Sequence, residues 1–111
     1  MSLFDQINTA GNSNEAAAKE KHIPSIKLEK ISDGKVKVKI NVGEGKHPNE
    51  IDHWIQWVEL RVNNLFIGRA EFSAAIMDPI TEFTVNVKAG AVISVIERCN
   101  KHGLWEAKVT V

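Results

Sequence analysis

The chain has 111 residues, with 14 basic and 14 acidic side chains, so its formal net charge is zero. This length suits one domain, and a hydrophobic content of 43% is enough for a packed core. Zero net charge argues against a general nucleic-acid binder, which needs a basic surplus to neutralise phosphates. No apolar stretch reaches the roughly 18 residues of a membrane span, so we expect no membrane insertion.

The N-terminal segment is polar and contains no apolar run of signal-peptide length, so we expect a cytoplasmic protein. Within it, Asn12–Asn14 followed by Glu15–Lys19 is suited to cap and begin a short helix. We expect residues 1–19 to form an N-terminal extension and residues 20–111 to form the single folded domain.

The rest of the chain alternates between polar and apolar residues in short runs. Lys35–Val42 alternates strictly, which predicts a strand with one wet face and one buried face. Further strand-like runs cover residues 53–62, 65–72, 80–87, 91–96 and 105–111. Gly68 interrupts one of them and marks a bulge or a close approach of another side chain.

Turn signals separate these runs, among them Asp33-Gly34, Asn63-Asn64, Asp78-Pro79 and Lys88–Gly90. About seven short strands at intervals of roughly 8–12 residues predict an all-β fold, an antiparallel β-sandwich of the immunoglobulin-like type. A parallel sheet would need crossover helices, for which this chain has no room.

The residue types that commonly bind metals lie at the ends of these runs or in the loops between them. They are His22, His47, His53, Cys99 and His102. Cys99 and His102 form a C-x-x-H pair, and the first two loop histidines after His22 lie six residues apart. Each feature is weak alone, since a single buried cysteine is usually a packing residue. Because the loops of a sandwich cluster at its ends, all five side chains can converge on one metal ion.

The donor types leave more than one metal open. Structural zinc is almost always four-coordinate. Blue copper would use Cys99, two histidines and an axial methionine such as Met77, which leaves the other histidines without a role. Four imidazoles and one thiolate instead give a square pyramid with a sixth position open, which suits a redox iron.

Three motifs resemble those of the superoxide reductases, also called neelaredoxins, and of the iron domain of desulfoferrodoxins. They are Glu20-Lys21-His22-x-Pro24, His47-Pro48 with His53 six residues after the first, and Cys99-Asn100-x-His102-Gly103-Leu104-Trp105. They occur in the family's order and cover the chain from about Glu20 to Trp105.

The resemblance implies one mononuclear non-haem iron per chain, which reduces superoxide by one electron to hydrogen peroxide. It implies that His22, His47, His53 and His102 are equatorial ligands and that Cys99 is the axial ligand. It also implies that Glu20 occupies the sixth position in the ferric state and that Lys21 attracts or orients superoxide. The family fold is an immunoglobulin-like sandwich, in agreement with the strand count.

The chain departs from the family pattern in several places. With a single cysteine it lacks the four-cysteine iron centre of the desulfoferrodoxins, which places it in the one-iron class. The stretch between His53 and Cys99 is short and includes the tight Asn63-Asn64 turn. Asp52 stands where glutamate is usual, and Lys101 adds a positive charge inside the C-x-x-H pair.

Partners and rival functions follow from the same residues. The family implies a rubredoxin-like electron donor and a homo-oligomer, either a dimer or a tetramer. The main alternative is a cupredoxin-like electron carrier, and a second is a non-catalytic sandwich module that holds no metal. The three tryptophans, Trp54, Trp57 and Trp105, are expected to pack in the core or at an interface, although Trp105 follows the metal motif closely enough to wall the site.

Overall fold

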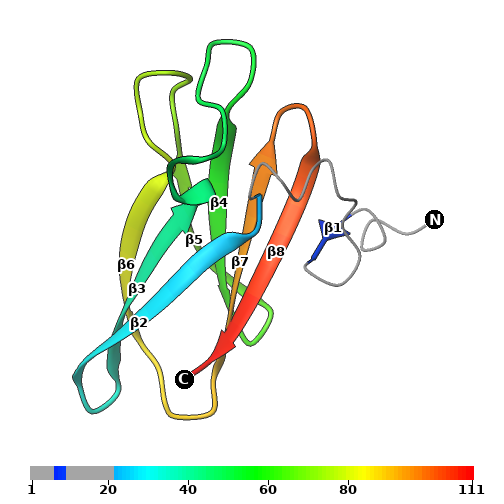
Figure 1. Cartoon of the computed structure of the whole chain (residues 1–111). Helices are drawn as coiled ribbons and strands as arrows, with labels where there is room; N and C mark the ends of the chain where they lie inside the picture. The colour runs from blue at the N-terminus through cyan, green and yellow to red at the C-terminus, as the bar shows by residue number, and fades with distance from the viewer. Residues whose placement is uncertain (1–6, 10–21) are drawn as a thin grey trace.

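The computed structural model describes residues 7–9 and 22–111, which form two β-sheets packed face to face (Figure 1). The larger sheet has the order β1-β8-β7-β4-β5 and the smaller has the order β2-β3-β6. The strands are β1 (Ile7–Asn8), β2 (Pro24–Ser32), β3 (Lys35–Val42), β4 (Ile55–Val62), β5 (Leu65–Glu71), β6 (Ile80–Asn86), β7 (Val92–Cys99) and β8 (Gly103–Thr110). The predicted all-β sandwich is confirmed.

The described residues contain eight strands where about seven were predicted. The run at residues 35–42 was predicted with its observed bounds, and the later runs differ from β4 to β8 by only a few residues at their ends. β1 was not expected and pairs in parallel with β8, where the Asn8 side chain donates to the Leu104 carbonyl at 3.0 Å. The predicted helix over residues 12–19 lies outside the described residues.

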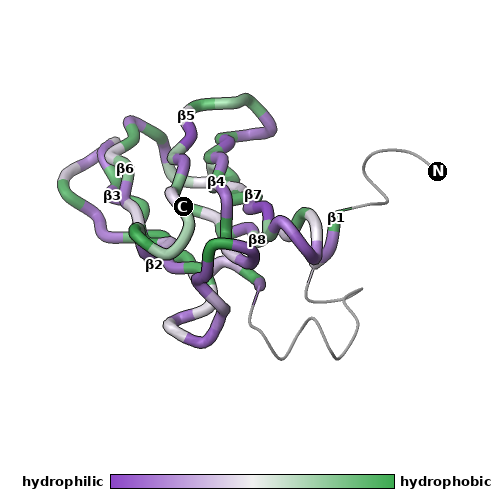
Figure 2. The backbone as a smooth tube through the Cα atoms, turned by 90° about the horizontal axis from the view of Figure 1, so that it is seen from above, coloured by the Kyte–Doolittle hydropathy of each residue, from purple (hydrophilic) through white to green (hydrophobic). Residues whose placement is uncertain are grey.

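The core lies between the two sheets and is built by the alternation. Along β3, Val36, Val38, Ile40 and Val42 are buried, while the lysines between them face outward. Seen from above, hydrophobic and hydrophilic residues alternate along the tube in both sheets (Figure 2). Burying each such aliphatic side chain contributes about 1.5–3 kcal/mol, so the pattern of β3 is sufficient to fix which face turns inward.

The predicted turns occur where the sequence marks them. Asn63 and Asn64 both have positive φ, at 49° and 67°, which is the backbone of a type I′ hairpin turn between β4 and β5. At Gly68 the register between these strands shifts, and an added Cβ would lie 3.3 Å from the Phe83 ring on β6. Gly68 therefore marks both a bulge and a close approach.

Three segments that carry the predicted donors meet at the upper end of the sandwich in Figure 1. They are the start of β2, the β3–β4 connection and the β7–β8 turn. A short 3₁₀ turn, η2 (Gly43–Gly45), opens the β3–β4 connection. No helix among the described residues is long and apolar enough to cross a bilayer.

Candidate metal centre

The structure brings all four histidines and the cysteine together. His22 lies two residues before the start of β2, and His47 and His53 lie in the β3–β4 connection. Cys99 is the last residue of β7 and His102 lies in the turn before β8. Segments that are up to 80 residues apart in sequence therefore supply one cluster.

The four imidazoles form a closed ring in which each contacts two neighbours edge to face. Ring centroids are 4.7 Å apart for His22 and His47, and 5.0 Å apart for His47 and His53. The ring closes through His102, whose centroid lies 5.4 Å from that of His53 and 4.9 Å from that of His22. The interplanar angles are between 66° and 79°, so no two neighbours stack.

The potential ligand atoms are close enough to share one ion. One atom from each of His22, His47, His53 and Cys99 lies within 4.8 Å of the others. His102 Nδ1 is 3.2 Å from His22 Nε2 and 3.9 Å from Cys99 Sγ. Metal–nitrogen bonds of about 2.1 Å separate ligands at right angles by about 3 Å and opposite ligands by about 4 Å. The residues present therefore fit a bound transition metal.

Burial differs from one side of the cluster to the other. Cys99 and His22 are fully buried and His47 is nearly so, whereas His53 is half-buried and His102 is exposed. The thiol therefore lies on the buried side of the cluster, and His102 lies on its more exposed side.

The His47 ring has a defined tautomer. Its Nδ1 lies 2.6 Å from the Pro48 carbonyl oxygen. A carbonyl only accepts hydrogen bonds, so Nδ1–H donates and Nε2 carries the lone pair that a metal needs.

Hydrogen bonds hold the β3–β4 connection in place. The backbones of Glu50 and His53 bond to each other in both directions, at 2.8 Å and 3.1 Å, across a turn at Ile51 and Asp52. The Asn49 side chain accepts from the Ala75 N–H at 2.9 Å and donates to the Met77 carbonyl at 3.1 Å. The loop between the two histidines is thus tied to the neighbouring β5–β6 connection.

Trp105 is part of the wall of this cluster. It is 1% exposed, and its indole stacks on the His22 ring at 4.6 Å between centroids and 9° between planes. Its Nε1–H donates to the His102 carbonyl at 3.1 Å. The packing role predicted for Trp105 is confirmed, and the same ring also orients two of the histidines.

The sequence matches the profile of the desulfoferrodoxin family over residues 14–108. The chain belongs to the desulfoferrodoxin family. It is 38% identical over 103 residues to a superoxide reductase of Thermococcus kodakarensis, a match that covers 83% of this chain and 88% of that protein. A desulfoferrodoxin of Nitratidesulfovibrio vulgaris is 40% identical over 91 residues, covering 82% of this chain and 64% of the relative.

Solved structures of this family have the same fold. A superoxide reductase (neelaredoxin) from Ignicoccus hospitalis aligns with a TM-score of 0.88 at 31% identity, covering 100% of this chain and 98% of that one. A reduced-form superoxide reductase (neelaredoxin) from Archaeoglobus fulgidus aligns with a TM-score of 0.77 at 30% identity, covering 96% and 98%. The sandwich described above is therefore the fold of the desulfoferrodoxin family.

Two residues that the family motif suggests for the site, Glu20 and Lys21, lie outside the described residues. Asp52 and Lys101, which depart from the family pattern, are both exposed. The backbone of Asp52 lies in the turn before His53, and Lys101 lies in the turn before His102.

Glu97 is a residue near the cluster that the sequence analysis missed. It lies on β7 two residues before Cys99, is fully buried, and neither carboxyl oxygen has a hydrogen-bond partner among the described residues. Burial raises the pKa of this carboxyl well above its usual value. The only signal in the sequence was a charged residue interrupting the apolar run of Val92–Cys99.

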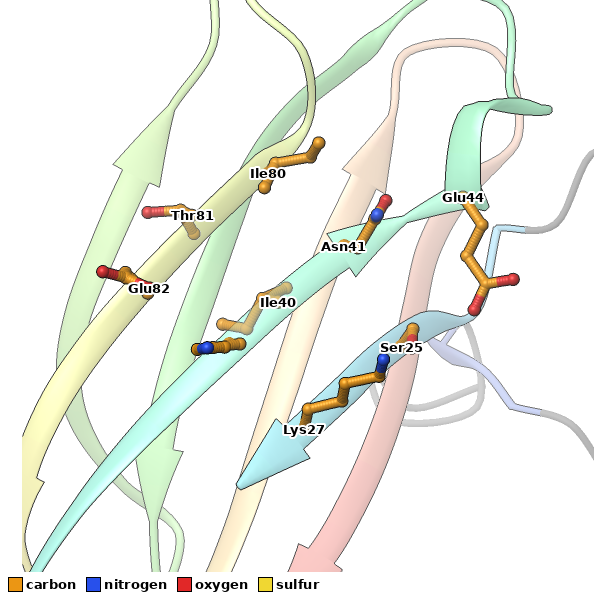
Figure 3. A pocket seen from close by; sticks show the side chains of 9 residues that line it. Ser25, Lys27, Ile40, Asn41, Glu44, Ile80, Thr81 and Glu82 are labelled. Atoms are coloured by element: carbon orange, nitrogen blue, oxygen red, sulfur yellow. The ribbon is translucent and has the colours of Figure 1, made fainter. Parts of the chain in front are cut away.

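A separate hollow lies on the outer face of the smaller sheet (Figure 3). It is lined by Ser25, Lys27, Lys39, Ile40, Asn41, Glu44, Ile80, Thr81 and Glu82. None of these is a histidine or a cysteine, so this hollow is distinct from the metal cluster. The lysines and glutamates of this face partly neutralise each other, as the 2.9 Å ion pair of Lys39 with Glu29 shows.

Proposed function

We propose that this chain is a superoxide reductase, which adds one electron and two protons to superoxide to give hydrogen peroxide. The observation that carries the proposal is the closed ring of four imidazoles with the buried thiol of Cys99 beside it. Relatives named superoxide reductase support it, since they align over most of both chains.

The number of donors favours one iron ion over the other metals considered. A structural zinc site would leave one of the five donors unused. The copper alternative, with two histidines, Cys99 and Met77, would leave two imidazoles unused, and Met77 Sδ accepts instead from the Ser73 N–H at 3.4 Å. Iron held by all five donors would supply the electron.

The geometry suggests which atom each residue offers. His22 and His47 would bind through Nε2, because His22 Nε2 faces His102 and the Nδ1–H of His47 donates to Pro48. His102 would bind through Nδ1. His53 would supply the fourth imidazole, and the Cys99 thiolate would hold the iron together with the four imidazoles.

Glu20 and Lys21 complete the proposal on the strength of the motif that ends in His22. The Lys21 cation would attract superoxide, which is an anion, and a local charge can do so in a chain of zero net charge. Glu20 would be a further carboxylate ligand of the iron in its ferric state.

The electron must be replaced after each turnover. We propose a small rubredoxin-like protein as the donor, acting at the exposed side near His102. A homo-oligomer remains a prediction from the family resemblance, and a cytoplasmic location remains a prediction from the polar N-terminal segment.

Metal content per chain is the first test, by elemental analysis of protein produced with added iron. About one iron per chain with little copper or zinc supports the proposal. Stoichiometric copper would favour an electron carrier, and no metal after anaerobic reconstitution would exclude the enzyme.

Superoxide kinetics follow on the iron-loaded protein. A reductase should oxidise one iron for each superoxide consumed and release no dioxygen, whereas a dismutase would release dioxygen.

A further inference from the structure

Asn100 connects the two turns that carry three of the proposed ligands. Its side-chain Oδ1 accepts from the Trp54 N–H at 3.0 Å, and its Nδ2 donates to the Asp52 carbonyl at 2.9 Å. Its own N–H donates to the Trp54 carbonyl at 3.3 Å. These partners are the residues immediately before and after His53, so one side-chain amide is hydrogen-bonded to the backbone on both sides of that histidine.

The orientation of this amide is determined by its partners. A backbone N–H only donates and a backbone carbonyl only accepts, so a flipped amide would lose both bonds. The side chain therefore sets one relative position of the 52–54 segment and the Cys99–His102 turn.

The strand pairing explains why a side chain is needed at this point. β4 and β7 pair up to Ile55 opposite Cys99, and the bond from the Asn100 N–H continues that ladder by one step. The returning bond, from the Trp54 N–H, goes to the side-chain oxygen of Asn100. The Asn100 carbonyl does not take that bond, so the main chain can turn toward His102 while the contact with β4 is kept.

His53 is connected to the Cys99–His102 turn through the bonds that Asn100 makes to its chain neighbours. The His22 ring is stacked against Trp105, and the His47 ring bonds to Pro48. His53 is half-buried, and its own backbone is held by Glu50, which lies in the same loop. The bonds from Asn100 to Asp52 and Trp54 tie its immediate neighbours to the turn that holds Cys99 and His102, while the Trp54 indole donates to the Phe72 carbonyl at 3.0 Å.

We infer that Asn100 is a positioning residue, which holds His53 in register with Cys99 and His102 for metal binding. This inference rests on the metal centre of the proposed function. It assigns a role to the second residue of the Cys99–His102 motif that does not involve contact with metal or substrate.

The test is a double-mutant cycle on cobalt(II) affinity, measured by competition with a chelator on anaerobic metal-free protein. Removing a group that orients a ligand typically weakens metal binding by about 10–100-fold, and we expect a loss of this size for Asn100→Ala. In a His53→Ala background, Asn100→Ala should change the affinity less than about twofold, since Asn100 acts through His53.

The cobalt spectrum provides a second readout. Asn100→Ala should keep the thiolate-to-cobalt absorption, since Cys99 is held by β7, while the ligand-field bands shift. Loss of the thiolate band in that variant would show instead that the whole turn has collapsed, and would overturn the assignment to His53.

Asn63→Ala is the matched control at the opposite end of the same strand pair. Asn63 Oδ1 accepts from the Val92 N–H at 2.9 Å, and its N–H donates to the Val92 carbonyl at 2.8 Å. This variant should lower the urea midpoint of the metal-free protein but leave cobalt affinity within about twofold of wild type. An equal loss of affinity in Asn63→Ala would assign the effect to general destabilisation and overturn the inference.

The remaining outcomes separate the two proposals. Tight cobalt binding by wild type that Asn100→Ala leaves unchanged, or weakens equally with and without His53, overturns the role of Asn100 alone. Absence of stoichiometric cobalt binding by wild type would remove the metal centre, and the role of Asn100 with it.

Discussion

Cys99 closes the buried side of the histidine ring, with Sγ 3.9 Å from His102 Nδ1. A thiolate is a far softer donor than a serine hydroxyl, which stays protonated at neutral pH. We therefore expect Cys99→Ser to abolish the family's thiolate-to-iron visible band and most superoxide reduction. The measurement is the absorption spectrum of the ferric protein with its iron content, alongside superoxide decay. Retention of both band and activity would disprove the ligand assignment.

Lys21 is proposed to act by charge and not by structure. Electrostatic attraction raises encounter rates by about 10–10³-fold and is screened by salt. Lys21→Ala should slow superoxide capture by about tenfold and flatten its dependence on ionic strength, with iron content unchanged. Pulse radiolysis at several salt concentrations measures this. Loss of iron in the variant would indicate a structural role, and Lys21→Arg, which keeps the charge, is the control.

Glu97 makes the stability of the fold depend on pH. Its folded-state pKa is raised by burial, so the folded state favours the neutral carboxyl. The free energy of unfolding is therefore highest, as far as Glu97 is concerned, below the unfolded-state pKa of about 4.5, and it falls as the pH rises toward the folded-state pKa. Glutamine does not ionise, so the free energy of unfolding of Glu97→Gln should not fall in this way. The variant should therefore become increasingly more stable than wild type as the pH rises. Urea unfolding of metal-free protein at several pH values tests this, and identical pH slopes would contradict it.

At the scale of elements, alternation predicted most strands because each has one face against the core. β2 was not singled out, although Ile26 and Leu28 alternate with polar residues and pack against the core; the second half of the strand is exposed. β1 has only two residues and is held by pairing with β8, which a local pattern does not encode. When a strand is set by pairing with another strand and not by its own alternation, the local sequence pattern does not reveal it.

The β4–β5 hairpin depends on two residues with left-handed backbone. Asn64 has a φ of 67° and is exposed, so its side chain contributes mainly through the conformation it tolerates. Alanine there should destabilise the fold by about 1 kcal/mol, while glycine should be nearly neutral. Urea midpoints of Asn64→Ala and Asn64→Gly measure the difference. Equal midpoints would show that φ at this turn does not limit stability.

For the whole molecule, the proposed metal joins segments from both sheets. His22 precedes β2 of the smaller sheet, whereas Cys99 ends β7 of the larger one. Metal binding to the folded state alone stabilises it by about 2.7 kcal/mol at a free concentration one hundred times the dissociation constant. Chelation should therefore lower the melting temperature by about 10 °C or more. Calorimetry of loaded and stripped protein tests this, and equal melting temperatures would argue against a shared ion.

The residues that form the candidate site could be named from the sequence. The chain's whole set of imidazoles and thiols lies at strand ends or in loops, and it consists of His22, His47, His53, Cys99 and His102. Their convergence was an expectation from the sandwich architecture, and the structure confirms it. The roles of Glu20 and Lys21 stay predictions.

Local sequence preferences were enough to predict most of the strands, the Asn63-Asn64 turn and the identity of the donors. The closed ring of imidazoles, the stacking of Trp105 on His22 and the burial of Glu97 depend on how distant segments meet. So do the bonds from Asn100 to the chain around His53, which exist only because β4 and β7 pair with Ile55 opposite Cys99. Register between strands is set by packing of the whole core, and a one-residue slip would undo each of these contacts while leaving every local pattern unchanged.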